Sequence, residues 1–174
     1  MYFWAFLPAL VYKMKLIIWI LVIVLTLTAC GYSTAQDELS DCLGIDVSRG
    51  TLVHEEDDHG GFHGDGTIYV AIQFQDDAVE AEILENTRWK SLPLTDTLST
   101  LIYGTTTVTQ EGSVSIGPYL DVTIPEVNNG YYFFYDRQRE IYEDSEVLNR
   151  TSFNYTIAIY DADTNQLYYC EYDT

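Results

Sequence analysis

The chain has 174 residues, with 8 basic and 27 acidic side chains and a formal net charge of −19 at pH 7. That sign excludes nucleic acid as a partner, because the phosphates would repel the protein, and it also excludes membrane attachment through a basic patch. The length is sufficient for one domain with its own hydrophobic core.

The first segment of the chain has the layout of a secretory signal. Residues 16–27 (LIIWILVIVLTL) carry no charge, and Lys15 precedes them. The run is too short to span a membrane, which needs about 20 residues, but it fits the apolar part of a signal peptide. We place the start of translation at Met14, because residues 1–13 would otherwise put two lysines in the middle of one apolar stretch.

The residues that follow, Leu27-Thr28-Ala29-Cys30, resemble the lipobox of bacterial lipoproteins, which is an aliphatic residue, two small residues and a cysteine. The resemblance implies that residues 1–29 are removed as a lipoprotein signal peptide and that Cys30 carries a diacylglycerol. Two acyl chains hold a protein firmly on a membrane. The chain is therefore expected on the outer face of the cell membrane. An uncleaved transmembrane anchor gives the same topology without the lipid.

Beyond the anchor, residues 30–41 are small, polar and acidic and are interpreted as a tether, and residues 42–174 as one globular domain. Cys42 and Cys170 form an even pair outside the cytoplasm, which indicates a disulfide. Such a bridge would contribute about 4–5 kcal/mol in the chain-entropy model. Two reduced thiols are the alternative.

Most of the domain has the composition of β-strands. Residues 67–74 (TIYVAIQF) alternate between two faces, which predicts a half-buried strand. Helices are expected at residues 76–86 and 95–103, the second of which ends at Gly104. Further strands rich in Thr, Val, Ile and Tyr are predicted at residues 105–110, 119–124, 131–136, 153–160 and 167–172. The predicted fold class is α+β, mainly an antiparallel β-sheet with one or two short helices packed on one face.

All three histidines lie in the connection before residue 67, within residues 54–66 (HEEDDHGGFHGDG). Its glycines exclude a stable helix. Imidazoles and carboxylates bind zinc and similar divalent ions, but the spacing matches no established zinc motif. A structural acidic loop without a cofactor is the simpler interpretation, and a contact loop for a peptide or protein is a third. The candidate metal ligands are His54, His59, His63 and Asp65.

The tyrosine-rich strands provide a second candidate surface. A row of tyrosines on the solvent side of a sheet binds glycans or peptides, although tyrosine is also an ordinary sheet residue. The candidate contact residues are Phe62, Tyr132 and Tyr168.

The segments HGGFHGDG, TIYVAIQF and YYFFYD resemble small uncharacterised lipoproteins of Gram-positive bacteria. This resemblance covers most of the domain and implies no particular activity. Two functional hypotheses remain. The first is a non-enzymatic binding module, displayed by the lipid on Cys30, whose ligand is an extracytoplasmic protein, peptide or glycan. The second is a small metal-dependent hydrolase that uses the histidine loop as ligand set and Glu56 as base.

Overall fold

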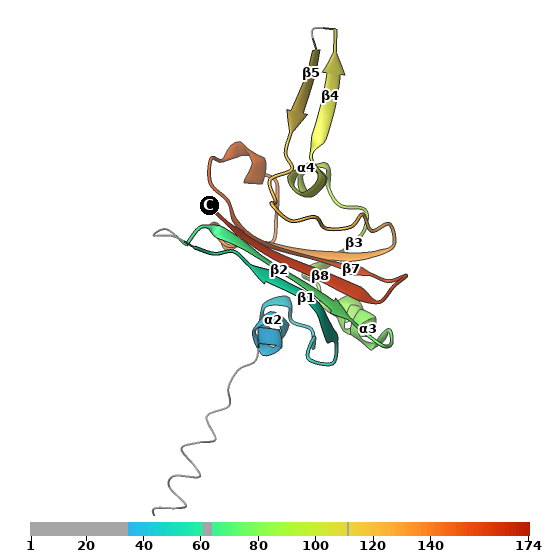
Figure 1. The fold of residues 1–174 in the computed structure, drawn as a ribbon. Helices are drawn as coiled ribbons and strands as arrows, with labels where there is room; N and C mark the ends of the chain where they lie inside the picture. The colour runs from blue at the N-terminus through green and yellow to red at the C-terminus, as the bar shows by residue number, and fades with distance from the viewer. Residues whose placement is uncertain (1–34, 61–63, 111) are drawn as a thin grey trace, which may run out of the picture. The chain divides into compact units, whose positions relative to one another are not determined.

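A six-stranded antiparallel sheet forms the centre of the fold (Figure 1). The computed structural model describes residues 35–60, 64–110 and 112–174, and its domain begins at Ala35. The strand order in the sheet is β1-β2-β8-β7-β6-β3, while β4 and β5 pair only with each other in a second sheet. Within the described ranges the predicted α+β class with a mainly antiparallel sheet is confirmed.

The structure assigns eight strands and four helical segments to the described residues. The strands are β1 (Thr51–Asp57), β2 (Gly66–Gln73), β3 (Trp89–Ser91), β4 (Thr105–Thr109), β5 (Gly112–Ile116), β6 (Gly130–Asp136), β7 (Asn154–Asp161) and β8 (Gln166–Asp173). The helices are α2 (Ala35–Leu43), α3 (Ala78–Glu85), α4 (Asp96–Tyr103) and the 3-10 helix η1 (Val147–Asn149).

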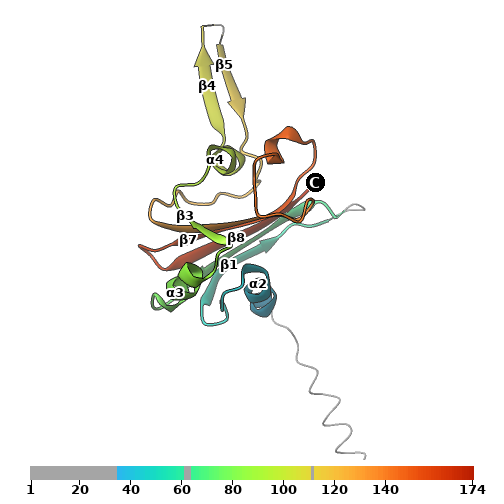
Figure 2. The same ribbon diagram turned by 180° about the vertical axis from the view of Figure 1, so that it is seen from behind.

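Helices cover both faces of the sheet, as the two opposite views show (Figures 1 and 2). On one face, called the α2 face here, Leu43 of α2 and Ile83 of α3 pack on Ile72 and Tyr169 of the sheet. On the other, called the α4 face, Leu101 of α4 packs with sheet residues in a second core. The prediction that helices lie on only one face is therefore wrong. Each core needs its own helical cover because the central strands carry large apolar side chains on both faces.

The predicted tether overlaps a helix. α2 begins at Ala35, inside residues 30–41, and its Leu39 and Leu43 are buried. These two leucines are four residues apart and so lie on one side of the helix, facing the sheet. Cys30 and the predicted signal peptide lie outside the described residues. In the part of the chain that the structure describes, no helix combines the length and apolarity needed to cross a membrane.

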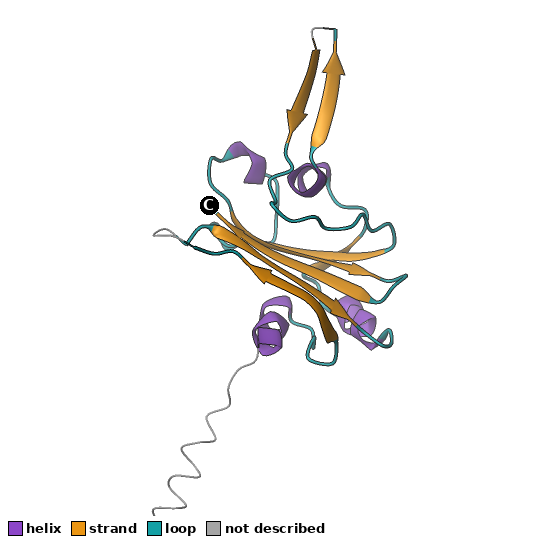
Figure 3. Cartoon of the chain, in the orientation of Figure 1, coloured by secondary structure: helices purple, strands orange, loops and turns teal. Residues whose placement is uncertain are grey.

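The second sheet is a hairpin that stands out from the rest of the domain, above the C-terminal end of α4 in Figure 3. Thr95 caps the N-terminus of α4 with its side-chain oxygen, which accepts a hydrogen bond from the Leu98 backbone N–H at 3.1 Å, and Gly104 caps the C-terminus. β4 follows directly. The predicted strand at residues 119–124 is wrong, since that segment is irregular and its Leu120 and Ile124 pack into the core of the α4 face.

Candidate functional site

The histidine loop was the first candidate site, and the structure gives its two described histidines, His54 and His59, separate partners. His54 is an exposed residue of β1 whose Nε2 lies 3.6 Å from a carboxylate oxygen of Glu56. Its ring also lies 5.4 Å from the ring of Tyr69 on β2. These contacts place His54 on the α4 face of the sheet edge. The proposed general base, Glu56, is thus the partner of a predicted metal ligand.

His59 lies between two carboxylates. Its Nδ1 is 2.8 Å from Asp57 and its Nε2 is 3.1 Å from Asp173, the last residue of β8. The hydrogen bond to Asp57, together with that to Asp173, raises the pKa of His59 above its usual value of 6.5. Because both ring nitrogens face carboxylates, the protonated ring is favoured, and a protonated imidazole does not bind a metal. His59 therefore joins the start of the loop to the end of β8.

The backbone around His59 explains one of the glycines in the loop. A Cβ atom at Gly66 would lie 2.5 Å from the His59 Cα and 2.7 Å from its backbone nitrogen. The loop is closed further by the Gly60 N–H, which donates to the Asp65 carbonyl at 3.3 Å. Gly66 thus allows His59 to lie directly against the start of β2.

The predicted metal site is not assembled by the residues that can be placed. Across residues 35–60, 64–110 and 112–174, no three His, Cys, Asp or Glu side chains form a group able to hold a metal ion. Asp65 is exposed and shares no such group with His54 or His59. The predicted ligand His63 and the candidate contact Phe62 lie outside the described residues.

From Asp173 a line of polar contacts runs along the sheet to α2. Arg137 donates from Nη2 to Asp173 at 2.8 Å and from Nη1 to Glu171 at 3.1 Å. The Tyr169 hydroxyl donates to Glu171 and lies 4.0 Å from the Cys42 sulfur. Burial raises the pKa of the Cys42 thiol, which keeps it protonated and unreactive. The line is a structural connection with no activated nucleophile.

The predicted disulfide is absent, because Cys42 and Cys170 are free thiols on opposite faces of the sheet. Cys42 packs against the core of the α2 face, while Cys170 lies in the core of the α4 face. The pairing of β8 alternates its side chains, so that Tyr169 points toward Cys42 and Cys170 points away. Burial also raises the pKa of the Cys170 thiol.

The prediction of an exposed tyrosine surface is also wrong. Tyr132 and Tyr168 are only 4% and 8% exposed, and both belong to the core of the α4 face. Tyr155 and Tyr160, on the central strand β7, are fully buried. An exposed row of tyrosines would require one bare sheet face, and both faces are covered. These tyrosines are core residues.

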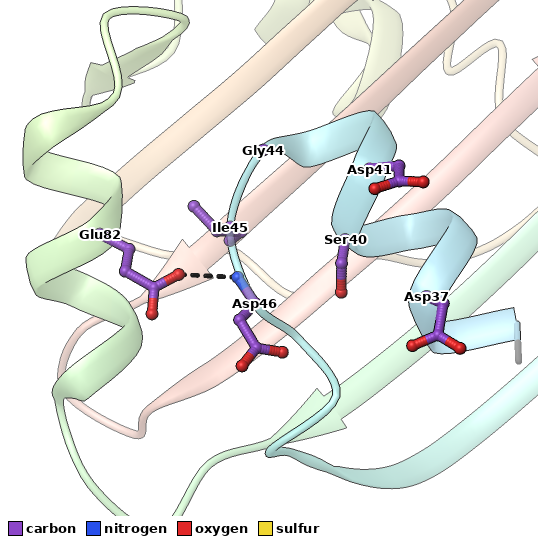
Figure 4. A pocket seen from close by; sticks show the side chains of 7 residues that line it. All are labelled: Asp37, Ser40, Asp41, Gly44, Ile45, Asp46 and Glu82. Atoms are coloured by element: carbon purple, nitrogen blue, oxygen red, sulfur yellow. Dashed lines mark hydrogen bonds between the residues drawn. The ribbon is translucent and has the colours of Figure 1, made fainter. Parts of the chain in front are cut away.

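One hollow of the α2 side is lined by acidic side chains (Figure 4). Asp37, Asp41, Asp46 and Glu82 all contribute to it. Two of them are already engaged, since Arg49 lies 3.2 Å from Asp46 and also forms an ion pair with Glu82. The Asp46 backbone N–H donates to Glu82 at 2.7 Å, which joins the loop after α2 to α3. These contacts give Asp46 and Glu82 a structural role.

The β4–β5 hairpin is the most unusual surface of the described chain. Every described residue of both strands is exposed, including Val108 at 79%, Val114 at 59% and Ile116 at 44%. Cross-strand pairing places Thr107 opposite Val114 and Thr105 opposite Ile116, so these four residues share one face. On the other face Thr106 and Ser115 join their hydroxyls at 2.9 Å. The hairpin thus exposes apolar side chains that no part of the described domain covers.

The hairpin is joined to the domain by a narrow neck of two glycines. Gly104 has φ +73° and Gly117 has φ +65°. A Cβ at Gly104 would lie 2.8 Å from the Gly117 carbonyl carbon, and a Cβ at Gly117 would lie 2.5 Å from the Thr100 carbonyl oxygen. The Tyr119 N–H then donates to the Leu101 carbonyl at 2.9 Å. Close backbone contact therefore holds both ends of the hairpin against α4.

The edges of the main sheet are protected against pairing with a further strand, and those of the hairpin are not. β1 is interrupted by a register shift between Leu52 and His54 and carries acidic side chains at its end. β3, at the opposite edge, has only three residues and includes Lys90. Bulges, charges and short length are the usual means of preventing a strand from joining an edge. β4 and β5 pair in unbroken register and carry no charged residue in either strand.

Sequence reasoning found β4 but missed the hairpin. The pattern TTTVT-QE-GSVSI, two β-type segments on either side of a short polar turn, was the signal that could have shown it.

Comparisons of the chain with protein-family models, with curated proteins and with solved structures gave no match.

Proposed function

We propose that this chain is a lipid-anchored, non-enzymatic binding module on the outer face of the cell membrane, and that the β4–β5 hairpin is its contact element. The anchor is Cys30 and rests on the lipobox-like residues 27–30 and the apolar run before them. Its ligand class is an extracytoplasmic protein, peptide or glycan, of which a polypeptide fits the hairpin best. Backbone edges recognise another backbone through strand pairing.

The observation that carries the proposal is the complete exposure of the hairpin. A two-stranded hairpin is marginally stable by itself in water, because its few side chains bury little surface. Here Val108, Val114 and Ile116 remain in solvent, and the glycine neck holds the hairpin at a fixed point of the domain. A partner that covers Val108 on one face of the hairpin, or Val114 and Ile116 on the other, would remove apolar area from water at about 25 cal/mol per Å².

The other candidate surfaces support a function less well. The tyrosines Tyr132 and Tyr168 are core residues, and His59 is held by two carboxylates. Among the residues that the structure describes, no observation favours the metal-dependent hydrolase.

Site-specific photo-crosslinking in the full chain tests the contact element. A photoreactive amino acid replaces Val108, and the matched control carries it at Leu84, an apolar α3 residue with 65% exposure. The cells that produce the protein are irradiated, and adducts are separated by mass. We expect a discrete adduct from position 108 and none from position 84. Equal labelling at both positions, or none at 108, would overturn the assignment of the hairpin.

Metabolic labelling with a fatty acid tests the anchor. The full chain is produced in a bacterium with radioactive palmitate and compared with Cys30→Ser and Cys42→Ser. We expect the label to be lost in Cys30→Ser and kept in Cys42→Ser, because the second thiol lies inside the domain, packed against the core of the α2 face. Label retained in Cys30→Ser would refute lipidation at this residue.

A further inference from the structure

The charge of the domain restricts how two copies can meet. Lys13 and Lys15 precede residue 35, so residues 35–174 contain 6 of the 8 basic side chains and all 27 acidic ones. Their formal net charge is therefore −21. Two such bodies repel each other, and the repulsion is screened only beyond the Debye length of about 8 Å at physiological ionic strength.

The hairpin is the part of this acidic domain where two copies can approach. Neither strand carries a charge, and Glu111 is the single charged residue in the sequence between Gly104 and Gly117. An acidic domain that bound basic partners would be expected to use its carboxylates. An uncharged contact element instead fits a partner that carries the same net charge as the domain itself.

β4 is complementary to itself in antiparallel pairing. Its sequence, TTTVT, consists of β-branched residues throughout, which favour strands. With Thr107 on a two-fold axis, it faces its own copy, and Thr106 faces Val108 of the partner. Threonine pairs and pairs of β-branched residues stabilise neighbouring strands, and no like charges meet. β5 is a weaker template, since it begins with Gly112 and contains two serines.

We propose that β4 pairs with β4 of a second copy of this chain, antiparallel and centred on Thr107, to give a four-stranded ribbon with the order β5-β4-β4-β5. This inference rests on the proposed function of the hairpin as the contact element and names its partner. The arrangement is a closed two-fold interface, in which each copy uses the same surface.

The geometry keeps the acidic bodies apart. In antiparallel pairing the two bodies lie at opposite ends of the ribbon, separated by about the length of a five-residue strand, roughly 17 Å. This exceeds the Debye length of about 8 Å, so the repulsion between them is largely screened. Pairing along an edge of five residues buries less surface than the about 1,200 Å² of a stable interface. The dimer is therefore weak in dilute solution and depends on the local concentration that a membrane anchor provides.

Cysteine crosslinking of the full chain in its membrane tests the pairing. Thr107→Cys places two thiols opposite each other at the two-fold axis, and the Cα separation across antiparallel strands, about 4.5–5.5 Å, suits a disulfide. The controls are Ser113→Cys on β5 and Leu84→Cys on α3, both exposed. After mild oxidation we expect at least about tenfold more disulfide-linked homodimer for Thr107→Cys than for either control, because their thiols meet only by collision.

The register gives a second measurement. Thr106→Cys and Val108→Cys chains, produced together with different tags, should crosslink to each other more than Thr106→Cys does to itself. Thr107→Lys, added to the Thr106→Cys and Val108→Cys chains, places two like charges at the axis and should abolish their crosslink, whereas Ser113→Lys added to the same chains should leave it.

Three outcomes distinguish this inference from the proposed function. A Thr107→Cys homodimer with the expected register supports both. Equal homodimer yields at positions 107, 113 and 84, combined with an adduct of a different protein at Val108, overturn the second copy as partner and leave the hairpin as the contact element. No homodimer and no adduct at Val108 overturn both.

Discussion

Replacing Gly104 by alanine should loosen the neck of the hairpin. Gly104 has φ 73° and ψ 169°, a region that residues with a Cβ rarely adopt, at a cost of about 1–3 kcal/mol. The new Cβ would also lie 2.7 Å from the Pro118 nitrogen. That neighbour is backbone and cannot rotate away, so the chain must shift, at about 1–3 kcal/mol for an overpacked site. The expected loss of stability is therefore about 2–6 kcal/mol.

Gly64→Ala is the matched control. Gly64 has φ +71°, close to that of Gly104, but a Cβ there meets nothing within 4 Å. Gly64→Ala should therefore lower the free energy of unfolding only by the backbone strain, about 1–2 kcal/mol. Urea unfolding of residues 35–174 gives the free energy of unfolding of both variants, and hydrogen exchange of the β4 and β5 amides shows whether the hairpin separates locally. Equal unfolding free energies with unchanged amide protection would refute the reasoning about the neck.

Three further substitutions test the domain itself, each by urea unfolding. His59→Gln should lower the free energy of unfolding at about pH 5.5 and have little effect at about pH 8.5. Because the pKa of His59 is raised in the folded state, its ion pairs contribute fully below the pKa of the unfolded state, near 6.5. This contribution is lost as the pH rises through the pKa of the folded state. An equal loss at both pH values would contradict this. Arg150→Met removes the cation that lies 2.9 Å from Asp136, whose side chain is 1% exposed. It should lower the free energy of unfolding by about 3–5 kcal/mol, because it leaves a buried carboxylate without its partner. A loss below about 0.5 kcal/mol would show that the pair is not buried. Leu101→Ala, at a fully buried site, should cost about 2–5 kcal/mol, against less than about 0.5 kcal/mol for the exposed Leu84→Ala, and equal losses would contradict the packing of α4.

The elements that could be predicted are those whose local pattern and tertiary setting agree. Residues 67–74, 153–160 and 167–172 are rich in β-formers and also lie in the middle of the sheet. The helix at α4 has its own signals, a Thr95 cap and a terminal Gly104. In these segments short-range preference and long-range packing favour the same structure.

The elements that could not be predicted depend on contacts from elsewhere in the chain. Residues 119–124 have a β-type sequence, but there Leu120 and Ile124 are used to cover the α4 face. α2 has two buried residues, Leu39 and Leu43, within a polar and acidic segment that resembles a tether. Tertiary packing decided both cases against local preference.

The candidate sites could not be predicted for a related reason. Sequence shows that tyrosines and histidines are close along the chain, but not which face of a strand is covered. Tyr132 is buried in a core that α4 helps to build on its face, and the second carboxylate beside His59 belongs to Asp173, 114 residues later in the chain. The exposure of the hairpin follows from the absence of any described element above it, a property that no local pattern contains.

The placement of the two thiols on opposite sides of the sheet has a consequence for the conditions under which the domain can fold. Cys42 and Cys170 are separated by the β8 backbone itself, and both are held as protonated thiols by burial. Within residues 35–60, 64–110 and 112–174 the fold therefore contains no disulfide that an oxidant must form or a reductant can break. We therefore expect the described domain to reach the same structure in reducing and in oxidising surroundings, because Cys42 and Cys170 cannot meet across the sheet.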